Sequence, residues 1–343
     1  MSEIITIGLD IAKNVFQVHG IDGSGGIVIR RKLRRGEVVG FFEKLEPCLV
    51  GMEACATSHY WARALMELGH EVKLMPPTYV KAYLKRQKND AADAEAICEA
   101  VTRPTMRFVP VKSAEQQGVL MLHRSRELLI RQRTMLINGL RAHLAEFGIV
   151  MRQGIGGVST LMTLVEDDEH GLFPEIAREA LLSLVAQLRD AYDRISMIDR
   201  QILVWHRSNE ESRRLETIPG IGPITASAMV ATITDPTLFH SGRDLAAWIG
   251  LVPRQNSSGG KERLGHISKK GDSYLRRLLI TGAIAMLRFA RNGQGARTTQ
   301  WAASLLSRKP YKVAAAALAN KMARIVWAVM TRQEEFRPQL AAS

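Results

Sequence analysis

Cysteine is scarce in this sequence. Its three cysteines, Cys48, Cys55 and Cys98, are spread over 343 residues, and none forms a CxxC pair. An odd, widely spaced set supports neither a disulfide framework nor a zinc ribbon. We therefore expect three small buried side chains.

Long apolar runs and a targeting signal are also missing. Asn320, Lys321 and Arg324 interrupt the Ala-rich stretch near the C-terminal end, so no run reaches the roughly 20 residues of a membrane span. The opening residues, SEIITIGLDIAK, lack the basic segment and long apolar core of a secretory signal peptide. The sequence thus predicts a soluble, cytoplasmic protein without membrane association.

Acidic residues are outnumbered, because 34 Asp and Glu stand against 47 Lys and Arg and give a formal net charge of +13. Such a chain carries a positive field that attracts polyanions and makes their binding depend on salt. Nucleic acid is the predicted partner, and a basic but otherwise ordinary enzyme is the alternative. The 46% hydrophobic content and the length predict a globular protein with two domains.

The pattern of apolar residues divides the chain into three regions. Strand-like runs alternate with helical stretches over about residues 1–112, which indicates an α/β or α+β domain. Residues 113–208 contain two long amphipathic stretches, about 113–147 and 174–207, which predict a coiled-coil arm or dimerisation element, or else a plain helical linker. Residues 209–335 are expected to form a mainly helical domain.

Carboxylates follow two of the predicted strands. Asp10 ends the apolar run ITIGL, and Glu53 ends CLVGM, at positions where a charge is poorly accommodated unless it is bound. Asp90 and Asp93 share one face of a predicted helix at i,i+3 spacing. These four oxygen ligands suit a pair of Mg²⁺ ions for phosphoryl transfer, although a helix-surface Asp is usually a solvated charge.

Asp10 also permits a second interpretation. An aspartate after a first strand also begins actin-like ATPases, but Ile11, Ala12 and Lys13 stand where those proteins need a Gly-rich phosphate turn.

The segment IPGIGPITASAMV resembles a helix-hairpin-helix, in which Gly220 and Gly222 bring backbone N–H groups to a DNA phosphate. An ordinary interhelical turn is the alternative.

The stretch from 250 to 277, GLVPRQNSSGGKERLGHISKKGDSYLRR, concentrates positive charge beside flexible backbone, so phosphates are expected to dock there. Ser257 and Ser258 could attack a phosphodiester, or could simply form a phosphate-gripping turn. The predicted nucleic-acid ligands in this stretch are Arg254, Lys261, Arg263, Lys269, Lys270, Arg276 and Arg277.

Six segments together resemble a known family: GLDIAK, GMEA, KNDAADA, IPGIGPITA, AAWIGLVPRQNSSGGK and GHISKKGDSYLR. In this order they are similar to the DEDD transposases of the insertion-sequence-110 type, and SSGGKERLGHISKKGD is most similar to the 1111-like subgroup. The resemblance covers nearly the whole chain, and its specificity lies in the combination of segments.

The resemblance implies an N-terminal RuvC-like domain of the ribonuclease-H type, a coiled-coil region and a C-terminal transposase domain. It places Asp10, Glu53, Asp90 and Asp93 at the four DEDD positions, as ligands of Mg²⁺. The family's nucleophilic serine precedes a glycine and follows a proline by five residues, which selects Ser258, with Ser257 as the fallback.

The resemblance also implies that a structured noncoding RNA, the bridge RNA, directs recombination of donor and target DNA through a 5′-phosphoserine. About 165 residues separate Asp93 from Ser258, so we expect the site to be assembled in space and the protein to be a dimer or tetramer. The alternatives are a RuvC-like nuclease that resolves DNA junctions by water attack, and a non-catalytic basic nucleic-acid-binding protein.

Overall fold

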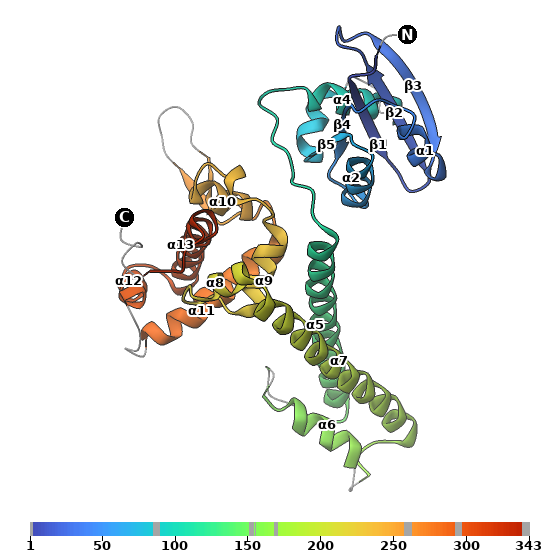
Figure 1. Cartoon of the computed structure of the whole chain (residues 1–343). Helices are drawn as coiled ribbons and strands as arrows, with labels where there is room; N and C mark the ends of the chain where they lie inside the picture. Colours follow the sequence, from blue (N-terminus) through green and yellow to red (C-terminus); the bar gives the residue numbers. More distant parts are fainter. Residues whose placement is uncertain are drawn as a thin grey trace. The chain divides into compact units, whose positions relative to one another are not determined.

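The computed structural model describes residues 3–84, 90–150, 154, 156–167, 171–256, 263–291 and 297–337. The chain divides into two compact units, Met1–Glu115 and Gln116–Ser343, and Figure 1 labels most of their helices and strands. The two units are described separately below.

The first unit is built on a five-stranded sheet in the order β3-β2-β1-β4-β5. β1, β2 and β3 form an antiparallel meander, while β1, β4 and β5 run parallel. The strands are β1 (Thr6–Ile11), β2 (Val15–Ile21), β3 (Ile27–Arg34), β4 (Leu49–Glu53) and β5 (Glu71–Met75). The helical elements are η1 (Arg35–Glu37), α1 (Val38–Phe42), α2 (Ser58–Glu67), α3 (Pro77–Val80), η2 (Lys81–Tyr83) and α4 (Asp90–Val101).

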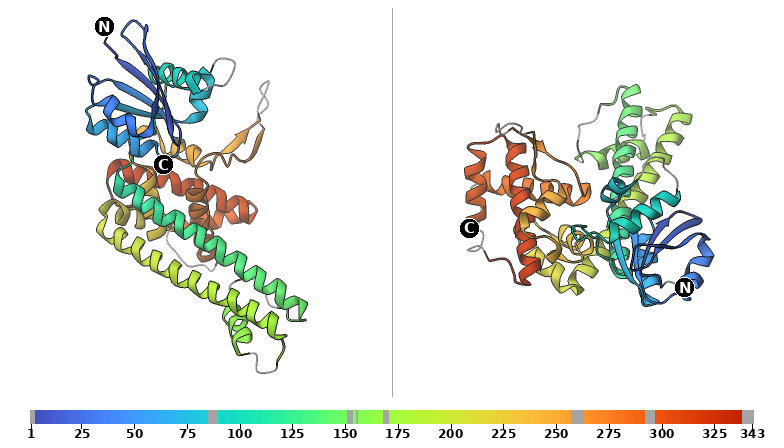
Figure 2. Two further views of the ribbon diagram at one scale, coloured as in Figure 1. Left: turned by 90° about the vertical axis from the view of Figure 1, so that its right-hand side faces the viewer. Right: turned by 90° about the horizontal axis from the view of Figure 1, so that it is seen from above.

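Alternation along β1 decides which side chains enter the core. Ile7 and Leu9 are fully buried in a cluster that α1 and α2 complete with Phe42 and Leu65. Burial of each such side chain stabilises the fold by roughly 1.5–3 kcal/mol. Because successive residues of a strand point to opposite faces, Gly8 and Asp10 belong to the other face of the sheet, which α4 covers (Figures 1 and 2).

Two glycines let α4 lie directly on the sheet. A Cβ on Gly8 would overlap the Ala94 carbonyl oxygen and the Cys98 nitrogen, and a Cβ on Gly51 would lie 2.7 Å from Cβ of Val101. Any larger residue at either position would therefore push the helix away. The two glycines fix the distance between α4 and the strands β1 and β4.

The second unit contains two long helices, α5 (Ala114–Glu146) and α7 (Glu175–Ser208), with α6 (Val158–Asp167) between them in sequence. Arg126 of α5 forms an ion pair with Asp199 of α7, and the Arg133 guanidinium lies 5.3 Å from the centre of the Tyr192 ring. Contacts that advance along α5 thus retreat along α7, so the helices run antiparallel, as Figure 2 shows. Whether they supercoil as a coiled coil stays a prediction.

The rest of the second unit is mainly helical and surrounds one apolar core. Its elements are α8 (Glu210–Glu216), α9 (Pro223–Thr232), η3 (Pro236–Leu238), α10 (Gly242–Ile249), β6 (Pro253–Gln255), β7 (Leu264–Ile267), α11 (Ser273–Arg291), α12 (Arg297–Leu306) and α13 (Tyr311–Arg332). α13 is long and apolar enough to cross a membrane by composition, but half of its apolar window is buried inside the structure. Ala319 and Val326 are fully buried in the core, as expected of a core helix.

The predicted fold class is confirmed in its main features, since a mixed α/β sheet is followed by a mostly helical C-terminal part. Both the predicted connector, 113–208, and the predicted C-terminal domain, 209–335, fall almost wholly within the second unit. The boundary between them at residue 208 therefore stays a prediction.

Candidate functional site

Asp10 and Glu53 leave neighbouring parallel strands at the same edge of the sheet. The register pairs Leu9 of β1 with Met52 of β4, and each of these residues is followed directly by the carboxylate. Adjacent strands lie about 4.8 Å apart, so the two acidic residues are neighbours. Both side chains are half-buried. The structure therefore brings these two predicted ligands together.

The pKa of Cys55 reflects the negative charge at this edge of the sheet. Loss of solvent around the thiol raises the pKa of Cys55, and the charges of Glu53 and Asp10 raise that pKa further. Cys55 itself is exposed, while Cys48 and Cys98 are buried. The expectation of three buried cysteines was thus wrong for Cys55, which follows β4 at the surface edge of the sheet.

The start of α4 lies at the level of Asp10. Cys98 donates from Sγ to the Thr6 carbonyl at 3.8 Å, and Ala94, one turn earlier, lies on Gly8. α4 therefore runs antiparallel to β1, and one further turn brings the backbone of Asp90 level with Asp10.

Asp93 lies in the same first turn of α4 and is half-buried. The side chain of Asp90 lies outside the described residues. Among the residues that the structure describes, no group of three or more His, Cys, Asp or Glu side chains is arranged to hold a metal ion. The structure thus joins Asp10 with Glu53 and places the first turn of α4 beside them.

The donor set at this edge fits a hard divalent cation. Carboxylate oxygens are the ligands that Mg²⁺ prefers, and one or two carboxylates with water complete many of its sites. Cys55, the nearby thiol, keeps its proton because its pKa is raised, so it does not offer the thiolate that a softer metal needs. Asp10 and Glu53 are the residues suited to hold such an ion.

The predicted helix-hairpin-helix turn joins α8 to α9. Gly220 has a positive φ of 84°, and a Cβ there would lie 2.7 Å from the Met286 sulfur, so close packing on α11 accounts for this glycine. Gly222 precedes Pro223 at the start of α9, and a Cβ there would meet nothing within 4 Å. Of the two glycines, Gly222 leaves room for a phosphate, and DNA binding at the turn stays a prediction.

The two candidate serines lie between β6 and β7, a short antiparallel hairpin. Ser257, Ser258 and Lys261 are outside the described residues. On either side of them, the Asn256 N–H donates to the Arg263 carbonyl at 2.9 Å.

The chain crosses itself at the base of this hairpin. A Cβ on Gly250 would overlap the Lys270 carbonyl oxygen, and a Cβ on Gly271 would overlap that of Trp248. Both glycines have positive φ, 83° and 95°, a region that L-residues with a side chain rarely occupy. This crossing holds the two ends of the hairpin together.

The predicted cationic ligands fall into two groups. Arg276 donates to the Ile249 carbonyl at 2.7 Å, and Arg277 forms an ion pair with Glu127, so both make contacts within the protein. The second group lies along the hairpin and its base: Arg254, Arg263, Lys269 and Lys270. All four are exposed, as Arg277 also is, and Arg254 donates to the Ser268 carbonyl at 3.3 Å. The cations of the hairpin and its base are the candidates for binding phosphate.

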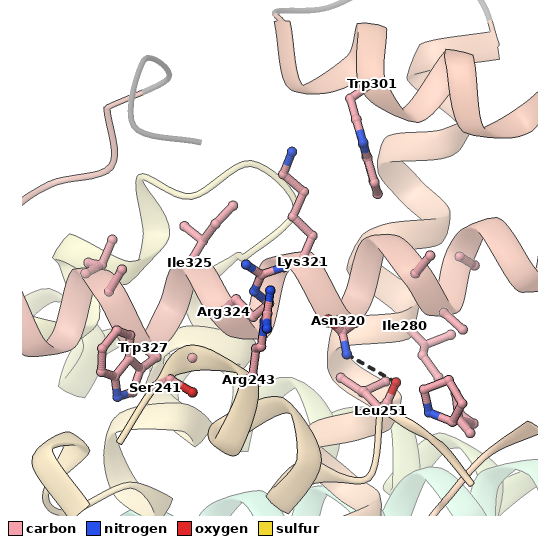
Figure 3. Close-up of a pocket in the computed structure, with 18 of the residues that line it drawn as sticks. Ser241, Arg243, Leu251, Ile280, Trp301, Asn320, Lys321, Arg324, Ile325 and Trp327 are labelled. Atoms are coloured by element: carbon pink, nitrogen blue, oxygen red, sulfur yellow. Dashed lines mark hydrogen bonds between the residues drawn. The ribbon is translucent and has the colours of Figure 1, made fainter. Parts of the chain in front are cut away.

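Sequence reasoning missed a large cavity of about 1750 Å³ in the second unit. Figure 3 shows Lys321 and Arg324 of α13, Arg243 of α10 and Trp301 of α12 around this space. The Lys321 ammonium lies 4.5 Å from the centre of the Trp301 ring, and burial together with the charge of Arg324 lowers the pKa of Lys321. The sequence did contain a sign of this cavity, because Lys321 and Arg324 interrupt an otherwise Ala-rich helix at i,i+3 spacing, which places both on one face.

A buried polar network near the start of α11 was also missed. Ser227 donates to the Pro223 carbonyl at 2.6 Å, so its oxygen accepts from Nε2–H of His123 at 3.1 Å. Nδ1 of His123 then accepts from the Tyr274 hydroxyl at 3.0 Å. Burial lowers the pKa of His123 to about 4. The network joins α5, α9 and α11 through a neutral imidazole.

Comparison with known proteins agrees with these features. A family model described as "Transposase" of the DEDD IS110 type matches residues 7–149, and one described as "Transposase IS116/IS110/IS902 family" matches residues 212–298. A "Probable family 20 transposase" of Pseudomonas aeruginosa is 51% identical over 97% of this chain and 98% of its own length.

Two further relatives are named for their insertion sequences. The "Transposase for insertion sequence element IS1328" of Yersinia enterocolitica is 41% identical over 98% of this chain and 99% of its own. The "Transposase for insertion sequence element IS1111A" of Coxiella burnetii is 41% identical over 98% of this chain and 92% of its own. These relatives each match 97–98% of the chain, and the protein belongs to the IS110 family of DEDD transposases, enzymes that cut and rejoin DNA.

Proposed function

We propose that this transposase recombines donor and target DNA under the direction of a bridge RNA and through a covalent phosphoserine intermediate. Mg²⁺ is the divalent ion of the reaction, with Asp10, Glu53, Asp90 and Asp93 as its ligands. The observation that carries the proposal is the register of β1 and β4, which makes Asp10 and Glu53 neighbours beside the start of α4.

Ser258 is the proposed nucleophile. Its Oγ loses its proton and bonds to the phosphorus of a DNA strand, while the bond from that phosphorus to O3′ breaks and O3′ takes up a proton. The products are a 5′-phosphoserine and a free 3′-OH. The 3′-OH of the exchanging strand then attacks the phosphoserine, which restores the serine hydroxyl. Mg²⁺, when bound, supplies positive charge that neutralises the transferred phosphoryl group.

The position of Ser258 in the chain supports this role. It follows β6 and precedes β7, and the exposed cations of the hairpin and its base surround this part of the sequence. Lys269, at that base, also lines the cavity with Lys321 and Arg324. We assign these cations to the phosphates of DNA or of the bridge RNA. The RNA itself is proposed from the family resemblance alone.

The proposal includes an oligomer formed through α5. Met121, Leu128 and Met135 recur every seven residues along this helix and are 67%, 53% and 72% exposed. An apolar stripe with heptad spacing is suited to pack against a second helix. We expect light scattering to give a dimer or tetramer, and a smaller mass after Leu128→Asp with Met135→Asp. An active protein that is strictly monomeric would contradict this part of the proposal.

The deciding experiment uses purified protein, the RNA transcribed from the flanking noncoding DNA, end-labelled donor and target duplexes and Mg²⁺. Products are separated on a denaturing gel. We expect labelled DNA to stay attached to the protein, Ser258→Ala to abolish the attachment, and the matched Ser257→Ala to retain it. Cleaved DNA without an adduct, persisting in Ser258→Ala, would instead indicate hydrolysis at the carboxylates, as in a junction-resolving nuclease.

A further inference from the structure

The edge strand β3 carries a row of cations that the transposase motifs do not include. Within IVIRRKLR, the residues Arg30, Arg31, Lys32 and Arg34 are exposed. Charge on an edge strand discourages pairing with other chains, and cations on either face of the sheet would serve that purpose. The face on which each cation lies can therefore indicate whether it has a further role.

The strand register sorts the cations onto two faces. Arg31 pairs with Val18, a residue of the buried core, and its guanidinium lies 5.8 Å from the centre of the Phe41 ring. Lys32 pairs with Gln17, and Gln17 pairs with Asp10. Because cross-strand partners point to the same face, Asp10, Gln17 and Lys32 form one row across β1, β2 and β3.

Distances along this face follow from strand geometry. The backbone of Lys32 is two strand spacings, about 10 Å, from that of Asp10. Arg34 pairs with Val15 on the same face, two residues or about 6.6 Å farther along β3. Both cations are exposed.

Arg30 shares this face but lies at the end that α4 covers. It pairs with His19, and His19 pairs with Gly8, on which α4 is seated. Its guanidinium forms an ion pair with Glu95 of α4 at 3.2 Å. Lys32 lies in the row of Asp10, level with the start of α4, and Arg34 lies two residues farther along β3, at the same end of the face as Asp10.

We infer that Lys32 and Arg34 bind the phosphodiester backbone of the DNA strand that is cut, and so position it at Asp10 and Glu53. The carboxylates and the DNA phosphates carry charge of the same sign and repel each other. Cations beside the carboxylates, on the same face, offset that repulsion by binding the flanking phosphates. Such contacts position a strand without reading its sequence. This inference rests on the proposed role of the carboxylates.

The first test measures binding of a labelled single-stranded DNA to the full-length protein in EDTA, over a range of salt concentrations. We expect Lys32→Ala with Arg34→Ala to weaken binding about tenfold and to flatten the log–log salt slope by roughly 1.4, the value for two phosphates on a single strand. Lys32→Arg with Arg34→Lys keeps both charges and should restore binding.

The matched control is Arg31→Ala with Lys44→Ala, which removes the same charge from the opposite face of β3 and from the exposed loop after α1. This variant should keep the wild-type salt slope. Equal flattening in both double variants, or none in either, would overturn the inference, because the effect would then come from net charge alone or from other surfaces.

The second test locates the strand. A photoreactive benzoylphenylalanine at Gln17, between Asp10 and Lys32, should crosslink to DNA, while the same group at Arg31 should not. Crosslinking to an RNA of the same sequence in preference to DNA would overturn the assignment to the cut strand. Neither test requires cleavage, so a failure of the Ser258 experiment would leave both results interpretable.

Discussion

The two units of this transposase hold their proposed functional residues by different means. In the first unit, Asp10 and Glu53 are placed by the register of two buried strands, and α4 is seated on glycine so closely that a Cβ has no room. In the second unit, a hairpin projects from a backbone crossing at Gly250 and Gly271, and its cations are exposed. We therefore expect the function of the acidic centre, Asp10 with Glu53, to depend on the exact position of its side chains. The function of the basic region, the exposed cations of the hairpin and its base, should depend mainly on their total charge.

Among the variants that we propose, Asp10→Asn should have the largest effect, a loss of recombination. The amide keeps the size of the side chain but removes the negative charge of a proposed metal ligand, so we expect recombination to fall by about 10²–10³-fold or more. DNA binding should be retained, since the exposed cations are unchanged. Gel assays of recombination and of binding measure the two effects separately.

The control for this prediction is Glu43→Gln, which removes one exposed carboxylate from the loop after α1. It should recombine at the wild-type rate. Loss of activity in both variants would show that net charge, rather than the position of Asp10, matters.

Gly8→Ala tests whether α4 must pack directly on the backbone of β1 at Gly8. The new Cβ would overlap the backbone at Ala94 and Cys98, so we expect the free energy of unfolding to fall by about 3 kcal/mol. Gly40→Ala in α1 is the matched control, because a Cβ there meets nothing within 4 Å and should stabilise the protein by up to about 1 kcal/mol. Urea unfolding measures both, and equal stability of the two variants would refute the prediction.

The buried His123, which hydrogen-bonds to Tyr274 at the start of α11, should make the stability of the protein depend on pH. Its pKa is about 4 in the folded protein, below the ordinary value of 6.5, so the unfolded chain takes up the proton first on acidification. The free energy of unfolding should therefore fall as pH drops from 6.5 to 4, by roughly 3 kcal/mol from this group. His123→Gln should lose this part of the pH dependence, and an unchanged pH profile of urea unfolding would contradict it.

Lys269→Ala and Lys270→Ala should give the smallest effects. Each removes one exposed cation at the base of the hairpin, so we expect binding to weaken a few-fold and the salt slope to fall by about 0.9 on duplex DNA. Binding isotherms at several salt concentrations measure this. An unchanged slope would show that these lysines do not touch phosphate.

The strands of the first unit were largely predictable, because apolar runs bounded by turns are local signals. Asp10 and Glu53 could be singled out as charges at the ends of such runs. Their adjacency follows from the parallel pairing of β1 with β4, which depends on a crossover of about forty residues that a local pattern does not encode.

The features that sequence reasoning missed arise from contacts between distant segments. His123 meets Ser227 and Tyr274 across separations of 104 and 151 residues. The cavity needs α10, α12 and α13 together. The face of Lys32 is likewise set by its pairing with Gln17, because a shift of one residue would exchange it with Arg31.

The backbone crossing below β6 and β7 has a consequence for engineering this enzyme. Lys269 N–H donates to the Gly250 carbonyl at 3.1 Å, and Ser268 N–H donates to the Val252 carbonyl at 2.7 Å, so hydrogen bonds between described residues close the loop at its base. Lengthening a loop that is already closed costs little, about 0.6 kcal/mol for each doubling. A peptide or reporter sequence inserted in this segment should therefore leave the helical core folded, which makes the hairpin a place where catalysis can be altered independently of stability.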